Sequence, residues 1–504
     1  MHVRPPNGAG AGTSREPRAT WWWLGVLVVL GILVRVAFLH QPMRQDEADT
    51  VVLFALTPVQ HILVDTSIPN NHILNSLLAK LAMGLFGNHP WVVRLPAFVA
   101  GVLVVPLTFF AGRALYSTSA GLIGAALAAA STPLVLYSTN ARGYTLIAAC
   151  SLGCLLCLIG APRSAGPRAW LAFAVLAATG ALVNPSMLYP AGGLVLWAGL
   201  ELLAERPIRV QRLRHLALAC AGAGFLALAA YAPAIAVSGW RSVVANDYVR
   251  PLAWGPFFRT LPGFAADAGH FVTAGWPMAV TAALAVMLAV AVVGHRAIAR
   301  HRWSVALVML AWALVLLLGM RRAPFPRVWL YLVPIFALAT GAGVAAVIDR
   351  IRLGASRTRG GLVAVALTLW LGAGVVSRQT VNLLDETGVF PDGESIAEAL
   401  APLLAPGDRI AARWRAQGPV DYYLRERGVQ ARFAADGDTI RGRLFVVPAH
   451  ALEETAEMVV TSRRLSGVDH RLAHTMAAFS RSAIWLIEPA QSALAPVEPN
   501  ARPR

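Results

Sequence analysis

Two neighbouring carboxylates, Asp46 and Glu47, follow directly after the first long apolar run of the sequence. Such a pair is suited to acid–base chemistry, because one carboxylate can take a proton while the other orients a substrate or binds a cation. Asn71 and His72 lie in the same polar stretch, residues 40–72. The acidic residues could also belong to a plainly solvated loop, and the asparagine could cap a following helix. We expect a site here, because polar backbone beside apolar spans is usually retained around a cavity.

Arginines form the second group of candidate residues. Arg142 stands between two tyrosines in the segment YSTNARGY, residues 137–144, and three more arginines lie in the segment RRAPFPR: Arg321, Arg322 and Arg327. A guanidinium group binds phosphate through two parallel hydrogen bonds. Arg142 is equally suited to anchoring its segment at a membrane surface. These residues therefore indicate a phosphate-bearing ligand or an interfacial anchor, and both interpretations stay open.

The composition shows what must position these side chains. The 504 residues are 57% hydrophobic and only 14% charged, whereas soluble domains carry about 25% charged residues. We therefore predict a membrane protein. The net charge of +17 does not indicate nucleic-acid binding, because the arginines lie in short gaps between apolar runs. A disulfide-stapled secreted domain is excluded, because three of the four cysteines lie in one apolar run, where we expect them to pack as small hydrophobic residues.

Apolar runs long enough to cross a bilayer as helices occur eleven times along the chain. They lie near residues 21–39, 91–112, 119–136, 143–160, 169–183, 187–204, 215–237, 272–293, 303–320, 328–348 and 361–377. Residues 73–87 have apolar side chains at helical spacing but contain Lys80, so we predict an amphipathic helix lying in the membrane interface. Arg35, inside the first run, could extend its charged end toward the membrane surface.

The arginines of the short connections set the predicted orientation. If the N-terminus is cytoplasmic, five short connections on that side all carry arginine: 113–118, 161–168, 205–214, 294–302 and 349–360. This topology places the loops 40–90 and 238–271, and everything after residue 377, on the extracytoplasmic side. We predict a multi-pass protein of the plasma or inner membrane, with a disordered cytoplasmic tail over residues 1–19.

Residues 378–488 have a different character from the apolar part, residues 20–377. Segments 395–405 and 419–428 predict helices, and segments 408–413, 443–448 and 483–489 predict strands. We therefore predict a small extracytoplasmic α/β domain here, either supporting the membrane part or binding an acceptor. Residues 489–504 are rich in Pro and Ala and are expected to be disordered.

Aromatic and charged residues are mixed in the outer loop 238–271. Tyr248 and His270 are candidates for stacking on a sugar and for hydrogen bonding to its hydroxyls, but the same composition fits a helix at the lipid headgroups. His72 and His270, together with nearby carboxylates, could also hold a divalent cation, since carboxylate and imidazole suit several such ions. The sequence leaves the cofactor open.

Five motifs, taken in order, resemble those of the GT-C-type integral-membrane glycosyltransferases. They are DEA (46–48), PNNHILNSLLAKL (69–81), LFG (85–87), RLPAFVAG (94–101) and ARGY (141–144). The resemblance covers about residues 20–380 and is strongest to the protein O-mannosyltransferase-like and aminoarabinose-transferase-like enzymes. With the eleven apolar runs, it predicts a polytopic all-α membrane domain of about eleven spans. It also implies transfer of a sugar from a polyprenyl-phosphate donor to a glycan, lipid or protein hydroxyl, with inversion, on the extracytoplasmic side.

On this resemblance Asp46 is expected to be the catalytic base, and Glu47 is expected to orient the acceptor or bind a metal. The donor phosphate would be neutralised by arginines: Arg142, with Arg94, Arg321, Arg322 or Arg327. The expected substrate contacts are Asn71, His72, Tyr144, Tyr248 and His270. The alternatives are a lipid-linked sugar flippase or transporter, or a glycan polymerase or ligase. A transporter should show paired repeats, and the sequence has no clear internal repeat. The sugar, whether mannose, arabinose or a related one, stays open.

Overall fold

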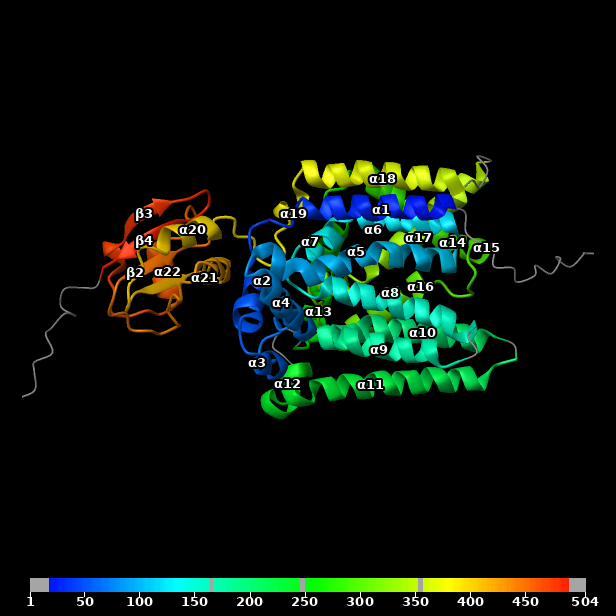
Figure 1. The fold of residues 1–504 in the computed structure, drawn as a ribbon, viewed down its shortest axis with the longest axis horizontal. Coiled ribbons are helices and arrows are strands. Elements are labelled where there is room, and N and C mark those ends of the chain that lie inside the picture. Colours follow the sequence, from blue (N-terminus) through cyan, green and yellow to red (C-terminus); the bar gives the residue numbers. More distant parts are fainter. Residues whose placement is uncertain (1–17, 164–165, 206, 245–249, 352–356, 489–504) are drawn as a thin grey trace, which may run out of the picture.

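A computed structural model describes residues 18–163, 166–205, 207–244, 250–351 and 357–488. Long helices run side by side in one bundle, and a small domain containing a sheet lies beyond one end of it (Figure 1). In this view α1 and α18 lie along one side of the bundle and α11 along the other. The two tails that the sequence predicts to be disordered lie almost wholly outside the described residues, and so does Tyr248.

Every predicted apolar span contains a helix of the bundle. The helices are α1 (Arg18–Val36), α5 (Pro90–Leu115), α6 (Thr118–Ala129), α7 (Thr132–Ser138), α8 (Tyr144–Gly160), α9 (Arg168–Val183), α10 (Leu188–Ala204), α11 (Val210–Ser238), α14 (Met278–Val293), α16 (Val305–Met320), α17 (Leu332–Arg350) and α18 (Arg357–Ser377). Among the described residues, six helices are long and apolar enough to cross a membrane alone, or eight spans if each of two bent pairs counts as one. The other three predicted spans, α8, α9 and α16, are apolar helices of 16 or 17 residues. The prediction of a polytopic helical membrane domain is confirmed.

A break between α6 and α7 gives Arg35 a role that the sequence does not reveal. The two helices are bent by 61°, and the carbonyl of Ala129 would normally accept from the residue four positions on, which is Pro133 and has no N–H. Arg35 Nη1 donates to this carbonyl at 3.1 Å, and its Nε donates to Ser138 Oγ at 3.0 Å. Arg35 is fully buried. The interpretation that its charged end reaches the membrane surface is therefore wrong, because the broken helix supplies polar partners inside the bundle.

Short elements cover the end of the bundle that faces the small domain (Figure 1). They are α2 (Gln45–Thr50), the π-helix η1 (Val51–Ala55), α3 (Val59–Val64), α4 (Ile73–Phe86) and α12 (Trp240–Val244). The predicted amphipathic helix forms as α4, and Lys80 Nζ donates to the carbonyl of Thr57 at 2.7 Å. Its ammonium group is thus bound to loop backbone beside the bundle end. The remaining helices are α13 (Trp254–Thr273), which forms a bent pair with α14, and the short helices η2 (Ala161–Arg163), η3 (Pro185–Met187), α15 (His295–Ile298), η5 (Pro326–Trp329) and α19 (Thr380–Leu383).

The small domain is an α/β unit, as predicted. It contains α20 (Gly393–Leu400), β1 (Arg409–Ala412), α21 (Gln417–Glu426), β2 (Leu444–Val447), α22 (Ala456–Ser462), η6 (His470–Leu472), β3 (His474–Ala478) and β4 (Ala483–Ile487). The sheet order is β1-β2-β4-β3, with β1 and β2 parallel and the other pairs antiparallel. The sequence does not predict β3, because this edge strand is largely exposed and lacks an apolar pattern.

The small domain shares a hydrophobic core with the bundle end. Met43 and Ala48, beside and within α2, belong to the same buried cluster as Ile396 and Tyr423 of the small domain. The Tyr423 hydroxyl also accepts a hydrogen bond from the Met43 N–H at 3.1 Å. The domain is therefore packed directly on the helix that carries the predicted catalytic carboxylates.

Candidate active site

Helix α2 presents Asp46 and Glu47 at the bundle end next to the small domain (Figure 1). The N–H groups of Gln45 and Asp46 donate to the carbonyls of Gly388 and Thr387, at 2.9 and 3.1 Å. These carbonyls lie in the linker, which we define as residues 384–392 between α19 and α20. The first turn of α2 is thus held by the segment that leads into the small domain.

Asp46 lies between two of the predicted phosphate-binding arginines. Its Oδ2 is 3.1 Å from Arg327 Nη2 and 3.7 Å from Arg142 Nη1, and Arg142 Nη1 also donates to the Asp46 carbonyl at 3.1 Å. The Asp46 side chain is 11% exposed. The Nε atoms of both arginines are buried and have no hydrogen-bond partner among the described residues. Three segments that are distant in sequence therefore meet in one cluster of a carboxylate and two guanidinium groups.

Glu47 and Arg94 form a buried ion pair. Arg94 Nε and Nη2 donate to the two carboxylate oxygens of Glu47 at 2.7 and 2.9 Å, and both residues are 0% exposed. Glu47 also accepts from the Ala141 N–H at 2.8 Å, while Arg94 Nη1 donates to the carbonyls of Leu39 and Gln41. This geometry does not support the expectations that Glu47 contacts the acceptor and Arg94 the donor phosphate, because both groups are saturated by protein partners. Instead, Glu47 holds the loop that carries the next residue, Arg142.

Asn71 and His72 also hold the backbone around the site. Asn71 Nδ2 donates to the carbonyls of Ile62 and Asp65 at 2.7 and 2.8 Å, so its amide is used inside its own loop. His72 Nδ1 accepts from the Gly143 N–H at 3.0 Å. Burial lowers the pKa of His72 well below its usual value, and the nearby arginines add to this shift. The imidazole is therefore neutral near pH 7, and its proton is on Nε2, which has no partner among the described residues.

Two predicted site residues show contrasting positions. The Tyr144 ring packs edge-on against His72, with ring centroids 4.9 Å apart, and the Arg142 guanidinium lies 5.7 Å from the Tyr144 ring centroid. His270, in contrast, is exposed on α13. The structure therefore brings Tyr144 to the arginine cluster and gives no support to a substrate contact by His270.

The three arginines of the RRAPFPR segment lie in different surroundings. Arg327 reaches Asp46, and its guanidinium also stacks on the Phe325 ring at 4.1 Å. Arg321 lies over the Trp254 ring at 5.5 Å, and its carbonyl accepts from the Leu252 N–H at 3.1 Å. Among the described residues, neither Arg321 nor Arg322 forms an ion pair with Asp46. The expected phosphate role is therefore supported by position for Arg327 and not for the other two.

Sequence reasoning misses two residues that hold the linker at the site. Arg44 donates to the carbonyls of Val381, Leu384 and Glu386 at 2.6, 2.8 and 2.7 Å, and burial lowers its pKa to about 10. Glu386 Oε2 accepts from Arg327 Nη1 and from the Tyr137 hydroxyl, at 3.1 and 3.2 Å. The position of Arg44 two residues before Asp46 is a weak signal, whereas nothing in the linker sequence marks Glu386.

The residues of the site do not fit a divalent cation. In the part of the chain that the structure describes, no three His, Cys, Asp or Glu side chains come together as metal ligands. Asp46 faces two guanidinium groups, Glu47 is saturated by Arg94, and His72 Nδ1 already accepts a backbone N–H. Two guanidinium groups thus flank the Asp46 carboxylate, which disfavours a further cation there.

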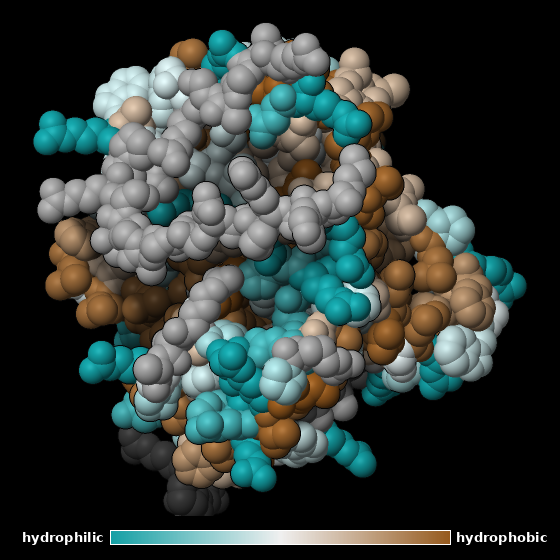
Figure 2. All heavy atoms as spheres, turned by 90° about the vertical axis from the view of Figure 1, so that its right-hand side faces the viewer, coloured by the Kyte–Doolittle hydropathy of each residue, from teal (hydrophilic) through white to brown (hydrophobic). Residues whose placement is uncertain are grey.

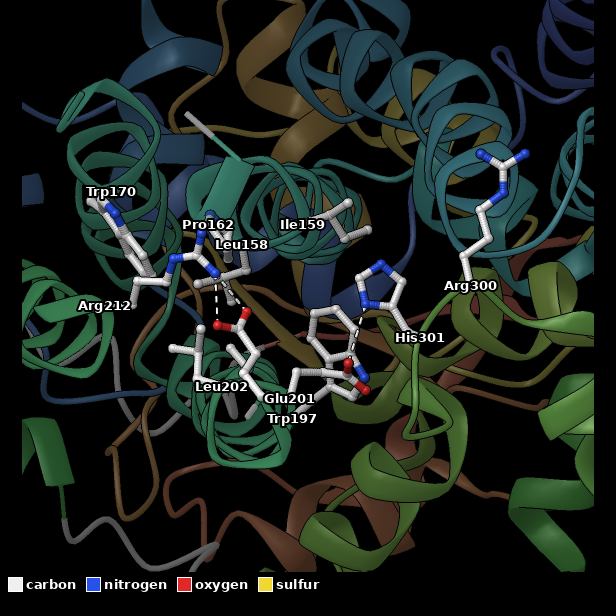
Figure 3. Close-up of a pocket in the computed structure, with 12 residues that line it drawn as sticks. Leu158, Ile159, Pro162, Trp170, Trp197, Glu201, Leu202, Arg212, Arg300 and His301 are labelled. Atoms are coloured by element: carbon white, nitrogen blue, oxygen red, sulfur yellow. Dashed lines mark hydrogen bonds and ion pairs between the residues drawn. The ribbon is translucent and has the colours of Figure 1, made fainter. Parts of the chain in front are cut away.

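A separate cavity of about 370 Å³ lies among the ends of α8, α10 and the connection before α16 (Figure 3). Two pairs of its charged side chains contact each other: Glu201 Oε2 lies 3.5 Å from His301 Nδ1, and Arg212 Nη1 donates to Glu205 Oε1 at 2.7 Å. The connections from α10 to α11 and from α14 to α16 lie at the end of the bundle opposite the small domain (Figure 1). Hydrophilic side chains gather over that end, with hydrophobic ones along its sides (Figure 2). This cavity is therefore distinct from the Asp46 cluster.

Comparisons with known proteins give matches for part of the sequence and for the fold. Residues 71–236 match a family model described as dolichyl-phosphate-mannose-protein mannosyltransferase. No curated protein gives a significant match to the sequence. The fold is similar to ArnT from Cupriavidus metallidurans in the apo state, with a TM-score of 0.61 and 14% identity over 95% of this chain and 100% of that one.

Two further solved structures share the fold. ArnT from the same organism bound to undecaprenyl phosphate gives a TM-score of 0.59, with 14% identity over 95% of this chain and 100% of that one. The Archaeoglobus fulgidus oligosaccharyltransferase gives 0.52, with 14% identity over 95% of this chain and 75% of that one. The resemblance to the GT-C-type membrane glycosyltransferases is therefore confirmed, in sequence over residues 71–236 and in fold over nearly the whole chain.

Proposed function

We propose that this protein transfers a sugar, a hexose or a pentose, from a polyprenyl-phosphate donor to a hydroxyl group of an acceptor. The observation that carries the proposal is the Asp46 carboxylate held between Arg142 and Arg327 at one end of a membrane-spanning bundle. The fold gives further support, since one of the proteins that share it, ArnT, has been solved bound to undecaprenyl phosphate.

The arrangement suits a direct displacement at the anomeric carbon. The acceptor hydroxyl gives its proton to Asp46 as its oxygen bonds to the anomeric carbon, and the bond from that carbon to the phosphate oxygen breaks. The polyprenyl phosphate leaves with the bonding electrons, and Arg142 and Arg327 neutralise the charge that develops on it. Attack from the face opposite the phosphate inverts the anomeric centre. Glu47 and Arg94 act at a distance, by fixing the loop that carries Arg142.

We infer that this end of the bundle faces away from the cytoplasm. The arginine-bearing connections from α10 to α11 and from α14 to α16 lie at the opposite end (Figure 1), and cytoplasmic loops are enriched in arginine. The small domain, packed on α2, then lies on the extracytoplasmic side, next to the helix that carries Asp46.

The test is transfer by purified protein in lipid nanodiscs, supplied with undecaprenyl-phosphate sugars and a mixture of cell-envelope acceptors. The release of undecaprenyl phosphate and the glycosylated product are both measured. Arg327→Gln is expected to lower kcat/KM by roughly tenfold or more, because a charge-assisted contact to the leaving phosphate is lost. Arg322→Gln is the matched control from the same segment and should stay near wild type. Equal losses in both variants would contradict the assignment of Arg327 to the leaving phosphate. If the wild-type protein transfers no sugar from any of the donors, the proposed function is contradicted.

A further inference from the structure

Glu386 is a carboxylate of the linker that lies beside the cluster described above. Its Oε2 accepts from Arg327 Nη1 at 3.1 Å and from the Tyr137 hydroxyl at 3.2 Å, and its side chain is 15% exposed. Arg327 therefore bridges two carboxylates, with Nη1 on Glu386 and Nη2 on Asp46. Because a guanidinium group is planar and rigid, two partners on its two terminal nitrogens fix its orientation.

The linker backbone is held without help from the Glu386 side chain. Arg44 donates to three carbonyls of this region, and the N–H groups of Gln45 and Asp46 donate to those of Gly388 and Thr387. A substitution that changes only the Glu386 carboxylate therefore leaves these contacts in place. The effect of the side chain on Arg327 can thus be separated from the fold of the linker.

The charges of the cluster also depend on Glu386. Asp46 and Glu386 carry two negative charges, and Arg142 and Arg327 carry two positive charges, so the four groups together are neutral. A donor phosphodiester carries one negative charge, while the released monoester carries between one and two near neutral pH. Removing the Glu386 charge would leave a net positive cluster, which binds the more highly charged product more tightly.

We propose that Glu386 is a positioning residue for the transfer reaction: it orients Arg327 toward the donor phosphate and keeps the cluster neutral so that the phosphate product is released. This inference rests on the proposed function. Through Glu386, the linker to the small domain becomes part of the active site. Without this linker, only the Asp46 carboxylate would hold Arg327.

The first experiment tests the positioning without any substrate. The full-length protein is treated with phenylglyoxal, and modification of Arg327 is followed by mass spectrometry. Glu386→Gln is expected to increase the rate at Arg327 by roughly threefold to tenfold, because an ion pair of its guanidinium group is replaced by a weaker hydrogen bond to a neutral amide oxygen. Glu394→Gln, whose carboxylate is 61% exposed in the small domain, is the matched control and should not change it. An unchanged rate in Glu386→Gln would overturn the inference.

The second experiment measures transfer and product inhibition by undecaprenyl phosphate. Glu386→Gln should lower kcat about tenfold, lower the inhibition constant of undecaprenyl phosphate, and leave the donor KM equal or lower, whereas Glu386→Asp should restore part of kcat. A raised donor KM with normal product inhibition would overturn the role in product release. If Arg327 becomes more reactive but wild type transfers no sugar, the proposed function fails while the positioning of Arg327 by Glu386 stands.

Discussion

Replacing Glu47 by Gln tests whether this residue positions the site or takes part in the chemistry. The carboxylate accepts from Arg94 at 2.7 and 2.9 Å and from the Ala141 N–H at 2.8 Å, and both members of the ion pair are 0% exposed. A glutamine of the same size removes the charge and turns an amide N–H toward groups that are themselves donors. Breaking a buried ion pair in this way costs about 3–5 kcal/mol.

The assay is the free energy of unfolding in mixed micelles, measured by titration with a denaturing detergent. Glu47→Gln should lose stability on this scale, whereas the exposed control Glu394→Gln should stay within about 0.5 kcal/mol of wild type. The double variant Glu47→Leu, Arg94→Met should recover much of the loss, because an apolar pair of similar volume removes both buried charges. If Glu47→Gln keeps wild-type stability and loses only transfer, then Glu47 acts on the substrate and the positioning role is refuted.

Two further predictions concern single groups. Burial, opposed by hydrogen bonds from Gln45, raises the pKa of Asp49 from 3.8 to about 6. Its ionisation therefore lowers the free energy of unfolding as pH rises from about 4 to about 6, and the loss stays constant above pH 6. Asp49→Asn should stabilise the protein at pH 7.5 by about 1–3 kcal/mol and have little effect below pH 4. Equal effects at both pH values in unfolding titrations would contradict this. Arg35→Met should lower the free energy of unfolding by about 1–3 kcal/mol in the same titration. The reason is that the Ala129 carbonyl loses its donor, and Pro133 has no N–H to replace it. A loss below about 0.5 kcal/mol would show that the helix break needs no such partner.

The positions of the main polar residues could be predicted from the sequence, because apolar periodicity and arginine distribution fix which segments lie together at one end of the bundle. Asp46, Arg142 and Arg327 meet there. The roles of these residues are harder to predict. Glu47 and Arg94 bind each other in the structure, but the sequence does not distinguish such a buried ion pair from two groups that are free to bind a substrate.

Other features leave no pattern in the sequence at all. Glu386 lies in a linker without periodicity, and the use of Arg35 depends on a helix break elsewhere in the bundle. His270 is attractive by composition, but its helix leaves it exposed. In each of these cases the role of the residue depends on its neighbours in the folded structure, and the local sequence does not show which neighbours these are.

The central claim is that Asp46 takes the proton of the acceptor hydroxyl, and transfer by Asp46→Asn tests it most directly. In purified protein supplied with a polyprenyl-phosphate sugar that wild type uses, the variant should lose roughly 100-fold or more in kcat. It should still fold and bind undecaprenyl phosphate. Asp49→Asn, three residues further along α2, should keep most of the activity. Transfer by Asp46→Asn at a rate near that of wild type would contradict the account.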